Sequence, residues 1–246
     1  MSQRDSSPRA ILVVGAGDAT GGAIARRFAR EGYIACVARR NGDKLAPLVE
    51  AIENDGGQAR AFGCDARDEE QVQRLFETIE RDVAPLDAVI FNVGANVWFP
   101  ITETTARVYR KVWEMAAFAG FLVGREAARV MLPRQRGTII FTGATASLRG
   151  RAHFSAFSGA KFALRALAQS MARELGPQGV HVAHPIIDGA IDTAFIRDTL
   201  PELYRKKEQD GILNPEHIAE TYWQIHCQPR DCWVHELDLR PWQETF

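Results

Sequence analysis

The sequence predicts an α/β fold: a single domain with a doubly wound, seven-stranded parallel sheet and helices on both faces. Two observations carry this prediction. First, an apolar run at residues 11–14 leads into a glycine-rich turn and then into a helical pattern that ends at Gly32. Second, six more strand-like runs alternate with helical segments along the rest of the chain. Strands separated by helices form parallel sheets, and right-handed crossovers place helices on both faces.

The remaining elements follow in order. Strands are expected at residues 33–38, 59–63, 86–91, 137–142, 180–187 and 233–239. Helices are expected at residues 43–55, 69–82, 105–131, 155–175 and 215–226, with an irregular helical segment at 191–207. No linker or repeat interrupts this alternation, so we expect a frayed leader at residues 1–9 and one Rossmann-type domain at residues 10–246.

Composition argues against several classes of function. The 246 residues include 30 basic and 31 acidic side chains, and the formal net charge is -1. Because the basic residues are scattered, neither nucleic-acid binding nor membrane-surface binding is supported. No apolar run approaches the roughly 18 residues of a membrane span, and the polar N-terminus lacks the apolar region of a secretory signal. We expect a cytoplasmic protein with a small-molecule substrate.

Cysteine and histidine spacing does not predict a metal site. No CxxC pair occurs among the four cysteines, which are Cys36, Cys64, Cys227 and Cys232. We expect them to be buried thiols without disulfides. His181 and His184 lie three residues apart in an expected strand, so their side chains point to opposite faces of the sheet.

The glycine-rich turn is typical of a dinucleotide-binding site, because it joins a buried strand to a helix. Gly15 permits the sharp turn, while Gly17 and Gly21 remove side chains where the backbone approaches a pyrophosphate or packs against the strand. The helix N-terminus offers N–H groups and a partial positive charge to the phosphates. The alternative is an ordinary strand-to-helix turn. The expected cofactor-binding residues of the turn are Gly15, Gly17, Asp18, Ala19, Thr20 and Gly21.

Two arginines end the second expected strand. An enzyme that prefers NAD has an acid near this position to hold the ribose 2′-hydroxyl. Here Arg39 and Arg40 stand instead, and they can clamp a 2′-phosphate, which favours NADP while NAD stays possible. The charge of Asp18 near the same phosphates argues the other way. A solvated strand end is the alternative interpretation of both arginines.

The ends of the third and fourth strands complete a pattern that resembles the short-chain dehydrogenase/reductase family from residue 11 to the last strand. The family's TGxxxGxG turn corresponds to Val14-Gly15, Ala19 and Gly21, with its threonine and middle glycine replaced. Its NNAG motif corresponds to residues 91–94, of which Asn92 and Gly94 survive.

The resemblance also implies binding roles after the third and the sixth strands. The family aspartate that meets the adenine ring matches Asp65, which Ala66 follows. The proline-glycine pair after the sixth strand becomes Asp188-Gly189, and the family threonine near the nicotinamide matches Thr193.

The family's catalytic pattern is incomplete in this chain. Lys161 fits the lysine of YxxxK, and the resemblance gives it a second role in holding the nicotinamide ribose hydroxyls. The tyrosine position is then Phe157, the serine position is Ala144, and the asparagine position falls near Ala117. In the family, the tyrosine donates a proton to the carbonyl oxygen, the lysine lowers the pKa of the tyrosine, and the serine binds the same oxygen.

These replacements remove the groups that reduction of a ketone needs. Phe157 has no proton to give and Ala144 has no hydrogen bond to offer. Loss of a general acid costs about 10²–10⁴ in rate, and loss of an oxyanion donor about 10²–10³. His153, one turn before Phe157, is a candidate replacement acid, with a surface histidine as the alternative. A substrate that takes its proton from water, such as an activated alkene, needs no such residue.

Two functions therefore stay open. The first is an NADP(H)-dependent oxidoreductase that transfers hydride to or from a small apolar carbonyl, alcohol or activated alkene with an altered proton donor. The second is a catalytically impaired homologue that binds NADP(H) and acts as a sensor or partner subunit. The presence or absence of hydroxyl side chains in the site is the sequence feature that distinguishes these two functions.

The substrate region and the assembly are expected as follows. Trp98 and Phe99 either line an apolar substrate crevice or pack under a lid at residues 191–207, whose Phe195 and Ile196 face inward.

The resemblance implies a homodimer or homotetramer formed through the two long helices. Trp233 and Trp242 are further candidates for the interface. Alanines expected to permit close helix contact are Ala116, Ala117, Ala119, Ala163, Ala166 and Ala168.

Overall fold

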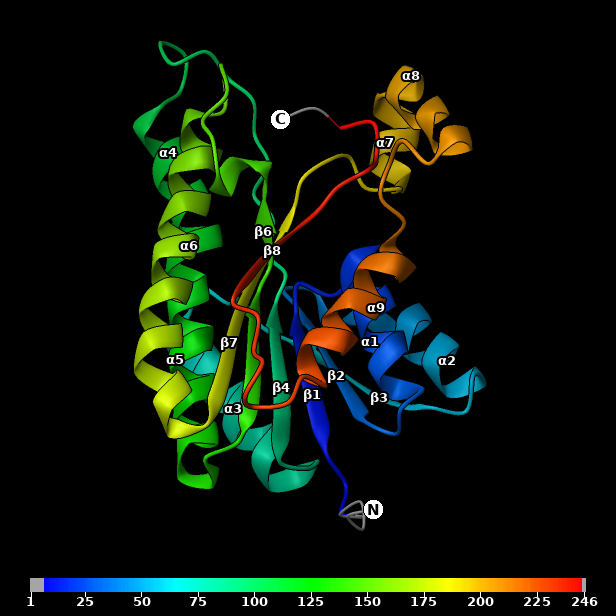
Figure 1. Ribbon diagram of the computed structural model, residues 1–246, viewed down its shortest axis with the longest axis vertical. Coiled ribbons are helices and arrows are strands. Elements are labelled where there is room, and N and C mark those ends of the chain that lie inside the picture. The colour runs from blue at the N-terminus through cyan, green and yellow to red at the C-terminus, as the bar shows by residue number, and fades with distance from the viewer. Residues whose placement is uncertain (1–6, 245–246) are drawn as a thin grey trace.

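A parallel sheet forms the middle layer of the molecule, between two layers of helices (Figure 1). The computed structural model describes residues 7–244. Within this range the strand order is β3-β2-β1-β4-β5-β7-β6, and β8 pairs with β7. The order reverses between β1 and β4, as in doubly wound folds that bind ligands beyond the carboxyl ends of their strands.

All seven expected strands are present. Their bounds are β1 Ala10–Val14, β2 Ile34–Arg39, β3 Gln58–Gly63, β4 Leu86–Phe91, β5 Gly137–Phe141, β7 Val180–Ile187 and β8 Glu236–Leu239. An eighth, two-residue strand, β6 (Gly143–Ala144), was not expected, and it pairs with Ile186 and Ile187 of β7. β8 begins three residues later than predicted, and Trp233, which was expected in the strand, stacks on His181.

Two apolar cores lie on opposite faces of the sheet. Ile11 and Val13 of β1 belong to the core that covers one face, whereas Leu12 and Val14 belong to the other. The strand is buried on both sides, which explains its continuous apolar run. One core includes residues from α1 (Thr20–Ala29), α2 (Ala46–Asn54) and α9 (Pro215–His226). The other includes residues from α3 (Glu69–Asp82), α5 (Ala119–Met131) and α6 (Ser155–Leu175).

The long helix expected at residues 105–131 is not continuous. It comprises α4 (Ala106–Trp113), a π-helical turn at Glu114–Phe118, and α5. Ala116 in this turn packs with Ala156 and Ala160 of α6. The small side chains let the two backbones approach closely.

The alanines expected to serve an interface lie mostly inside the subunit. Ala116, Ala117, Ala119 and Ala168 are buried within this single chain, so they are not available to a partner. The prediction is wrong for these four residues, because they pack α5 and α6 against each other and against the sheet. Ala163 is half-buried and Ala166 is exposed, so the prediction stays open for that pair.

The irregular segment after β7 is also broken into short pieces. It contains α7 (Ala194–Thr199), α8 (Pro201–Tyr204) and a 3₁₀ turn at Arg205–Gln209. Pro201 cannot continue the preceding helix, so a new one starts there. The expected inward orientation of Phe195 is wrong, since 64% of this residue is exposed.

Two smaller expectations differ in their outcome. Cys36 and Cys64 are buried, but Cys227 and Cys232 are exposed, so the prediction of burial is wrong for that pair.

Residues 1–6 of the expected leader lie outside the described residues, while Arg9 is held by Asp87, with Nη1 3.2 Å from Oδ2. Among residues 7–244, no helix is long and apolar enough to span a membrane.

Candidate functional site

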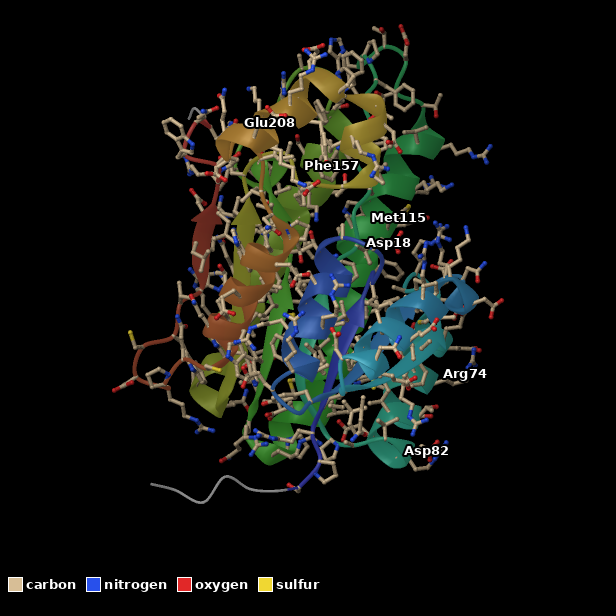
Figure 2. The ribbon with its side chains drawn as sticks, turned by 90° about the vertical axis from the view of Figure 1, so that its right-hand side faces the viewer. Asp18, Arg74, Asp82, Met115, Phe157 and Glu208 are labelled. Atoms are coloured by element: carbon tan, nitrogen blue, oxygen red, sulfur yellow. The ribbon has the colours of Figure 1, made fainter. Side chains whose placement is uncertain are left out.

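The expected site residues lie at or just beyond the carboxyl ends of the strands. Gly15 follows β1, Asn92 follows β4, and Asp188 follows β7. Figure 2 shows Phe157 in the upper part of the molecule, Asp18 below it near mid-height, and Asp82 near the lower end. The parallel sheet thus brings segments far apart in the sequence to one edge.

The glycine-rich turn is closely packed at Gly15 and Gly21, whereas the space beside Gly17 is empty. Gly15 has φ +87°, and a Cβ there would lie 2.7 Å from the carbonyl oxygen of Asn92. A Cβ on Gly21 would lie 2.7 Å from the Gly15 oxygen. A Cβ on Gly17, by contrast, would meet nothing within 4 Å, so this position leaves space for a ligand.

Gly22 was not among the expected site residues, although the turn depends on it. A Cβ there would lie 2.2 Å from the Gly17 oxygen, closer than any real contact. The signal in the sequence was the second glycine of the pair at the start of the helix.

The N-terminus of α1 is suited to a phosphate. No side chain caps this helix at Ala19, whereas Asp68 caps α3 and Asn214 caps α9. The first-turn N–H groups of α1 therefore remain available, together with the positive end of the helix dipole. Thr20 is buried at this end, and Asp18 is exposed in the turn before it.

Asn92 braces the turn from the neighbouring strand. Its backbone N–H donates to the Val14 oxygen at 2.8 Å, and its Nδ2 donates to the Gly15 oxygen at 3.2 Å. The side chain thus fixes the carbonyl of the first glycine. A Cβ on the nearby Gly94 would meet nothing within 4 Å.

The arginines after β2 are available for a ligand, whereas the acid after β3 is already engaged. Within residues 7–244, no hydrogen bond or ion pair holds the guanidinium of half-buried Arg39 or exposed Arg40. Asp65 accepts from Arg67 Nε at 2.9 Å and Nη2 at 2.5 Å, and these bonds hold the pKa of its carboxyl below the usual value. Ala66 beside it is buried.

Lys161 lies at the centre of the expected catalytic region. Only 3% of it is exposed, and its Nζ donates to the Thr142 oxygen at 2.8 Å and lies 3.5 Å from the Val93 oxygen. Burial lowers the pKa of its ammonium to about 8. Two carbonyl contacts leave one of its three N–H donors for a further acceptor.

Apolar groups occupy the two positions that the resemblance gives to catalytic hydroxyls. The Phe157 ring centroid lies 5.9 Å from Lys161 Nζ. The backbone N–H of Ala144 donates to Ser147 Oγ at 3.2 Å, which engages that buried hydroxyl. The Thr142 hydroxyl is likewise engaged, since it accepts from Tyr222 at 3.0 Å.

His153 stands in the loop before α6, with an exposed side chain and φ +70°. Its carbonyl oxygen accepts from the N–H of Phe99 at 2.9 Å, and its ring meets Trp98 edge-on at 5.3 Å. Trp98 and Phe99 are 65% and 40% exposed, so they do not pack under the lid.

Sequence reasoning did not give Asp188 a role, although it noted the unusual acid after a strand. Its carboxylate is fully buried and accepts from Thr145 Oγ1 at 2.6 Å, with Arg149 Nη2 at 3.3 Å. This links the segment after Ala144 to the end of β7. Gly189 next to it has φ +152°, and a Cβ there would lie 2.7 Å from Pro241.

Thr193 has a structural task in addition to its expected position near the crevice. Its Oγ1 accepts from the Ile196 N–H at 3.2 Å and thereby caps α7. The residue fixes where the segment over the carboxyl edge turns into a helix.

The two strand histidines have separate environments. His184 is fully buried, its Nδ1 lies 3.4 Å from Glu236, and burial lowers its pKa to about 4. His181 stacks on Trp233. In the part of the chain that the structure describes, no three His, Cys, Asp or Glu side chains are grouped to hold a metal ion.

Comparison with known proteins agrees with this architecture. The sequence model of the short chain dehydrogenase family matches residues 9–202. A short-chain dehydrogenase/reductase of Armillaria gallica is 29% identical over 180 residues, covering 72% of this chain and 69% of that protein.

Solved structures add a similar fold over nearly the whole chain. A short-chain dehydrogenase from Rhodopseudomonas palustris is 50% identical, with a TM-score of 0.82, covering 95% of this chain and 99% of that one. An alcohol dehydrogenase from Thermococcus sibiricus, complexed with 5-hydroxy-NADP, has a TM-score of 0.85 at 22% identity, covering 96% and 98%. From the family match over most of its length, the chain belongs to the short-chain dehydrogenase family.

Proposed function

We propose that this protein is an NADP(H)-dependent oxidoreductase that acts on a small apolar carbonyl, alcohol or activated alkene with an altered proton donor. The observation that carries the proposal is the open glycine-rich turn, with an uncapped helix N-terminus behind it and two unpaired arginines beside it. A pyrophosphate and a 2′-phosphate need these groups.

The chain's own residues divide the task of binding among three regions. The turn around Gly17 and the first N–H groups of α1 hold the pyrophosphate, and Arg39 with Arg40 holds the 2′-phosphate. Lys161 offers its remaining N–H to a ribose hydroxyl. A bound nicotinamide supplies or accepts the hydride. The Thermococcus sibiricus neighbour, complexed with 5-hydroxy-NADP, supports NADP(H), while NAD(H) stays possible for this chain.

The proton must come from a group other than residue 157. His153 is the candidate acid, because its exposed ring stands beside Trp98 in the loop before α6. The other route is water, with a substrate such as an enone whose carbanion is protonated without an enzyme acid. Exposed Trp98 and Phe99 support an apolar substrate, since they present aromatic surface near the crevice.

A second function is favoured by the same apolar positions. Phe157 and Ala144 offer no hydroxyl at the two positions that the resemblance gives to the catalytic tyrosine and serine. A protein of this kind binds NADP(H) without turnover and acts as a sensor or a partner subunit. Lys161 keeps its binding role in this alternative.

The experiment is NADPH oxidation over a panel of ketones, aldehydes and enones, comparing the wild type with the double variant Ala144→Ser, Phe157→Tyr. If the oxidoreductase proposal is right, the wild type turns over at least one compound. His153→Ala then lowers that rate by about 10²–10⁴ if the histidine is the acid.

Phe154→Tyr is the matched control, since it adds the same hydroxyl one turn away from residue 157. Turnover by the double variant alone supports the binding protein and contradicts the enzyme. An equal gain in Phe154→Tyr shows that position 157 is not the proton-donor position.

A further inference from the structure

The loop that joins β3 to α3 lies beside the end of β2, where the two arginines of the cofactor site stand. In the sheet Arg39 is the neighbour of Gly63, and the Arg39 carbonyl oxygen accepts from the N–H of Cys64 at 3.0 Å. Asp65 is the next residue of this loop. The backbone therefore brings an acid close to the arginines that we assign to the 2′-phosphate.

Arg67 occupies both oxygens of the Asp65 carboxylate. Its Nε donates to Oδ1 at 2.9 Å and its Nη2 donates to Oδ2 at 2.5 Å, so the guanidinium meets the carboxylate as a fork. The backbone N–H of Arg67 donates to the same Oδ1 at 3.1 Å. One residue thus fills three of the roughly four lone-pair sites of this carboxylate.

Gln71 in the first turn of α3 fixes the same loop. Its Oε1 accepts from the N–H of Asp65 at 3.0 Å. Its own backbone N–H and its Nε2 donate to the carboxylate of Asp68 at 3.0 and 2.8 Å. Both acids of the loop therefore have partners within residues 65–71, and neither depends on an arginine of β2.

This internal pairing matters because carboxylates and phosphates attract guanidinium groups in the same way. The bonds from Arg67 lower the pKa of the Asp65 carboxyl, and the charge of Arg40 adds to this effect. Arg40 is therefore within electrostatic reach of Asp65, although no ion pair in the described part of the chain joins their side chains. A carboxylate without Arg67 would compete with the cofactor for Arg40.

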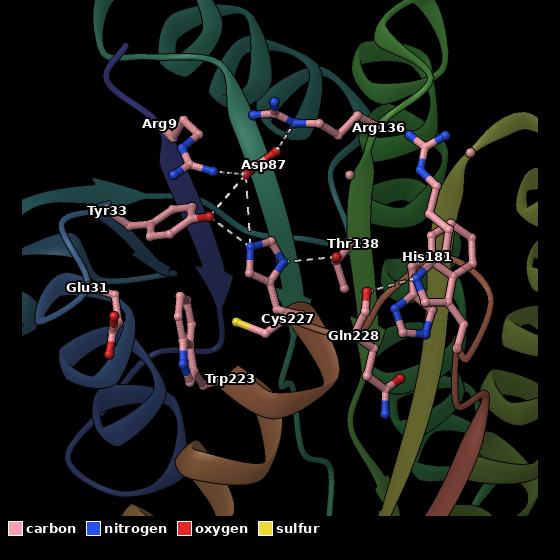
Figure 3. A pocket seen from close by; sticks show the side chains of 15 residues that line it. Arg9, Glu31, Tyr33, Asp87, Arg136, Thr138, His181, Trp223, Cys227 and Gln228 are labelled. Carbon is pink, nitrogen blue, oxygen red and sulfur yellow. Dashed lines mark hydrogen bonds and ion pairs between the residues drawn. The ribbon is translucent and has the colours of Figure 1, made fainter. Parts of the chain in front are cut away.

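Asp87, at the opposite end of the sheet, is an acid of this chain that binds two arginines at once. Figure 3 shows Arg9 and Arg136 on either side of it. Arg9 Nη1 lies 3.2 Å from Oδ2, and Arg136 Nε lies 2.8 Å from Oδ1. A carboxylate of this protein therefore draws in two guanidinium groups where both are within reach.

We propose that Arg67 is a positioning residue for the cofactor: by holding Asp65 it leaves the guanidinium of Arg40 to the 2′-phosphate, and so it sets the preference for NADPH over NADH. The inference rests on the proposed function, since it takes Arg39 and Arg40 as the binding groups of that phosphate. Arg67 acts through Asp65 and needs no contact with the cofactor.

The test is calorimetric titration of NADPH and NADH into the wild type and into Arg67→Ala. In this variant Asp65 loses its fork and pairs with Arg40. We expect the ratio of the two affinities to fall by at least about fivefold, mainly because NADPH binds more weakly. Both cofactors carry adenine, so a general disturbance of the adenine site would weaken both and leave the ratio unchanged.

Asp65→Asn separates this effect from damage to the loop. Added to Arg67→Ala, it removes the charge that attracts Arg40. The ratio of affinities should then return to within about twofold of the wild-type value, because the effects of two contacting residues are not additive. A merely structural role of Arg67 would not be reversed by a second substitution in the same loop.

Arg81→Ala is the matched control. Arg81 forms the same kind of fork with its neighbour Asp82, since Nε and Nη2 each donate at 2.7 Å, and it lies at the opposite end of α3. Its loss should change the ratio of affinities by less than about twofold.

Three results would overturn this proposal and leave the proposed function standing. They are an unchanged ratio in Arg67→Ala, no recovery on adding Asp65→Asn, and an equally large effect of Arg81→Ala. Absence of NADPH binding to the wild type would overturn both. If Arg67→Ala fails to fold, the same ratios decide with Arg67→Gln, which removes the charge and keeps a long side chain.

Discussion

Lys161 is a buried cation that no carboxylate within residues 7–244 neutralises. Its ammonium rests on the carbonyl oxygens of Thr142 and Val93, with an aromatic ring at residue 157 beside it. Burial of an unpaired charge costs stability, and the depressed pKa of this side chain reflects that cost. A protein that only had to fold would gain from an apolar residue here, which supports a binding role for Lys161.

The pH dependence of stability provides a test of this cost. Because the pKa of Lys161 falls from 10.5 to about 8 on folding, the unfolded chain binds more protons between these values. The unfolding free energy of the wild type should therefore rise relative to Lys161→Met as pH goes from 8 to 10.5, by up to about 3 kcal/mol. Urea denaturation at each pH measures the difference.

The same variant should bind NADPH at least about tenfold more weakly, since it loses a charged donor. Lys44→Met, which removes an exposed lysine, is the control for both measurements. A difference in stability that stays constant from pH 8 to 10.5 would contradict the buried-cation account.

The turn between β1 and α1 is the element on which the binding site depends. Its glycines serve two purposes, which the sequence alone could not separate. Gly15, Gly21 and Gly22 are required by backbone packing, whereas Gly17 faces open space. A side chain at Gly17 would therefore occupy space that is open to a ligand, whereas a side chain at the other three positions would overlap the backbone.

Two alanine substitutions separate packing from binding. Gly17→Ala should leave the melting temperature within about 2 °C of the wild type and weaken NADPH binding by at least about tenfold. Gly22→Ala should lower the melting temperature by several degrees even without a ligand, because its Cβ would overlap the Gly17 oxygen. Thermal denaturation and calorimetry measure the two effects. Unchanged NADPH affinity in Gly17→Ala would be incompatible with a pyrophosphate at this turn.

The elements that the sequence predicted well are those set by local patterns. The strands were predictable because β1, β4 and β7 are buried on both faces and hence continuously apolar. The gathering of Gly15, Asn92 and Asp188 at one edge of the sheet followed from their positions after the strands. The π-helical turn was not predictable, because its small side chains pack against α6, which is distant in sequence. The break between α7 and α8 had a local signal, which is Pro201.

Contacts between segments far apart in the sequence were also missed. Asp188 binds Thr145, 43 residues away, and Tyr33 binds Asp87, 54 residues away. Each of these residues has an ordinary local pattern in the sequence. Only the folded sheet brings them together, so neither contact could be predicted from the sequence.

At the scale of the whole molecule, the outer surface of α4–α6 bears exposed aromatic residues. Trp113 of α4, Phe118 of the π-helical turn and Phe121 of α5 stack in sequence, with centroids 6.0 and 6.3 Å apart. Phe121 is 41% exposed, and Phe162 on α6 is 42% exposed. Exposed aromatic groups on adjacent helices are typical of protein interfaces, and they support self-association through large side chains instead of the expected alanines.

Self-association through these helices can be tested by light scattering after gel filtration. We expect the wild type to run as a dimer or tetramer of the 27.3 kDa chain, and Phe121→Glu, Phe162→Glu to run as a smaller species. Phe195→Glu is the control, since it adds the same charge at an exposed ring outside these helices. A monomeric wild type would contradict the prediction, and so would dissociation by the control alone.

The central claim is that the carboxyl edge of the sheet is a site for NADP(H), whatever chemistry follows. Calorimetric titration of NADPH and NADH into the wild type and into Arg39→Gln, Arg40→Gln tests it most directly. We predict that NADPH binds the wild type at least about tenfold more tightly than NADH, because two guanidinium groups are available for the 2′-phosphate. The preference should disappear in the double variant. Absence of NADPH binding, or tighter binding of NADH to the wild type, would contradict the account.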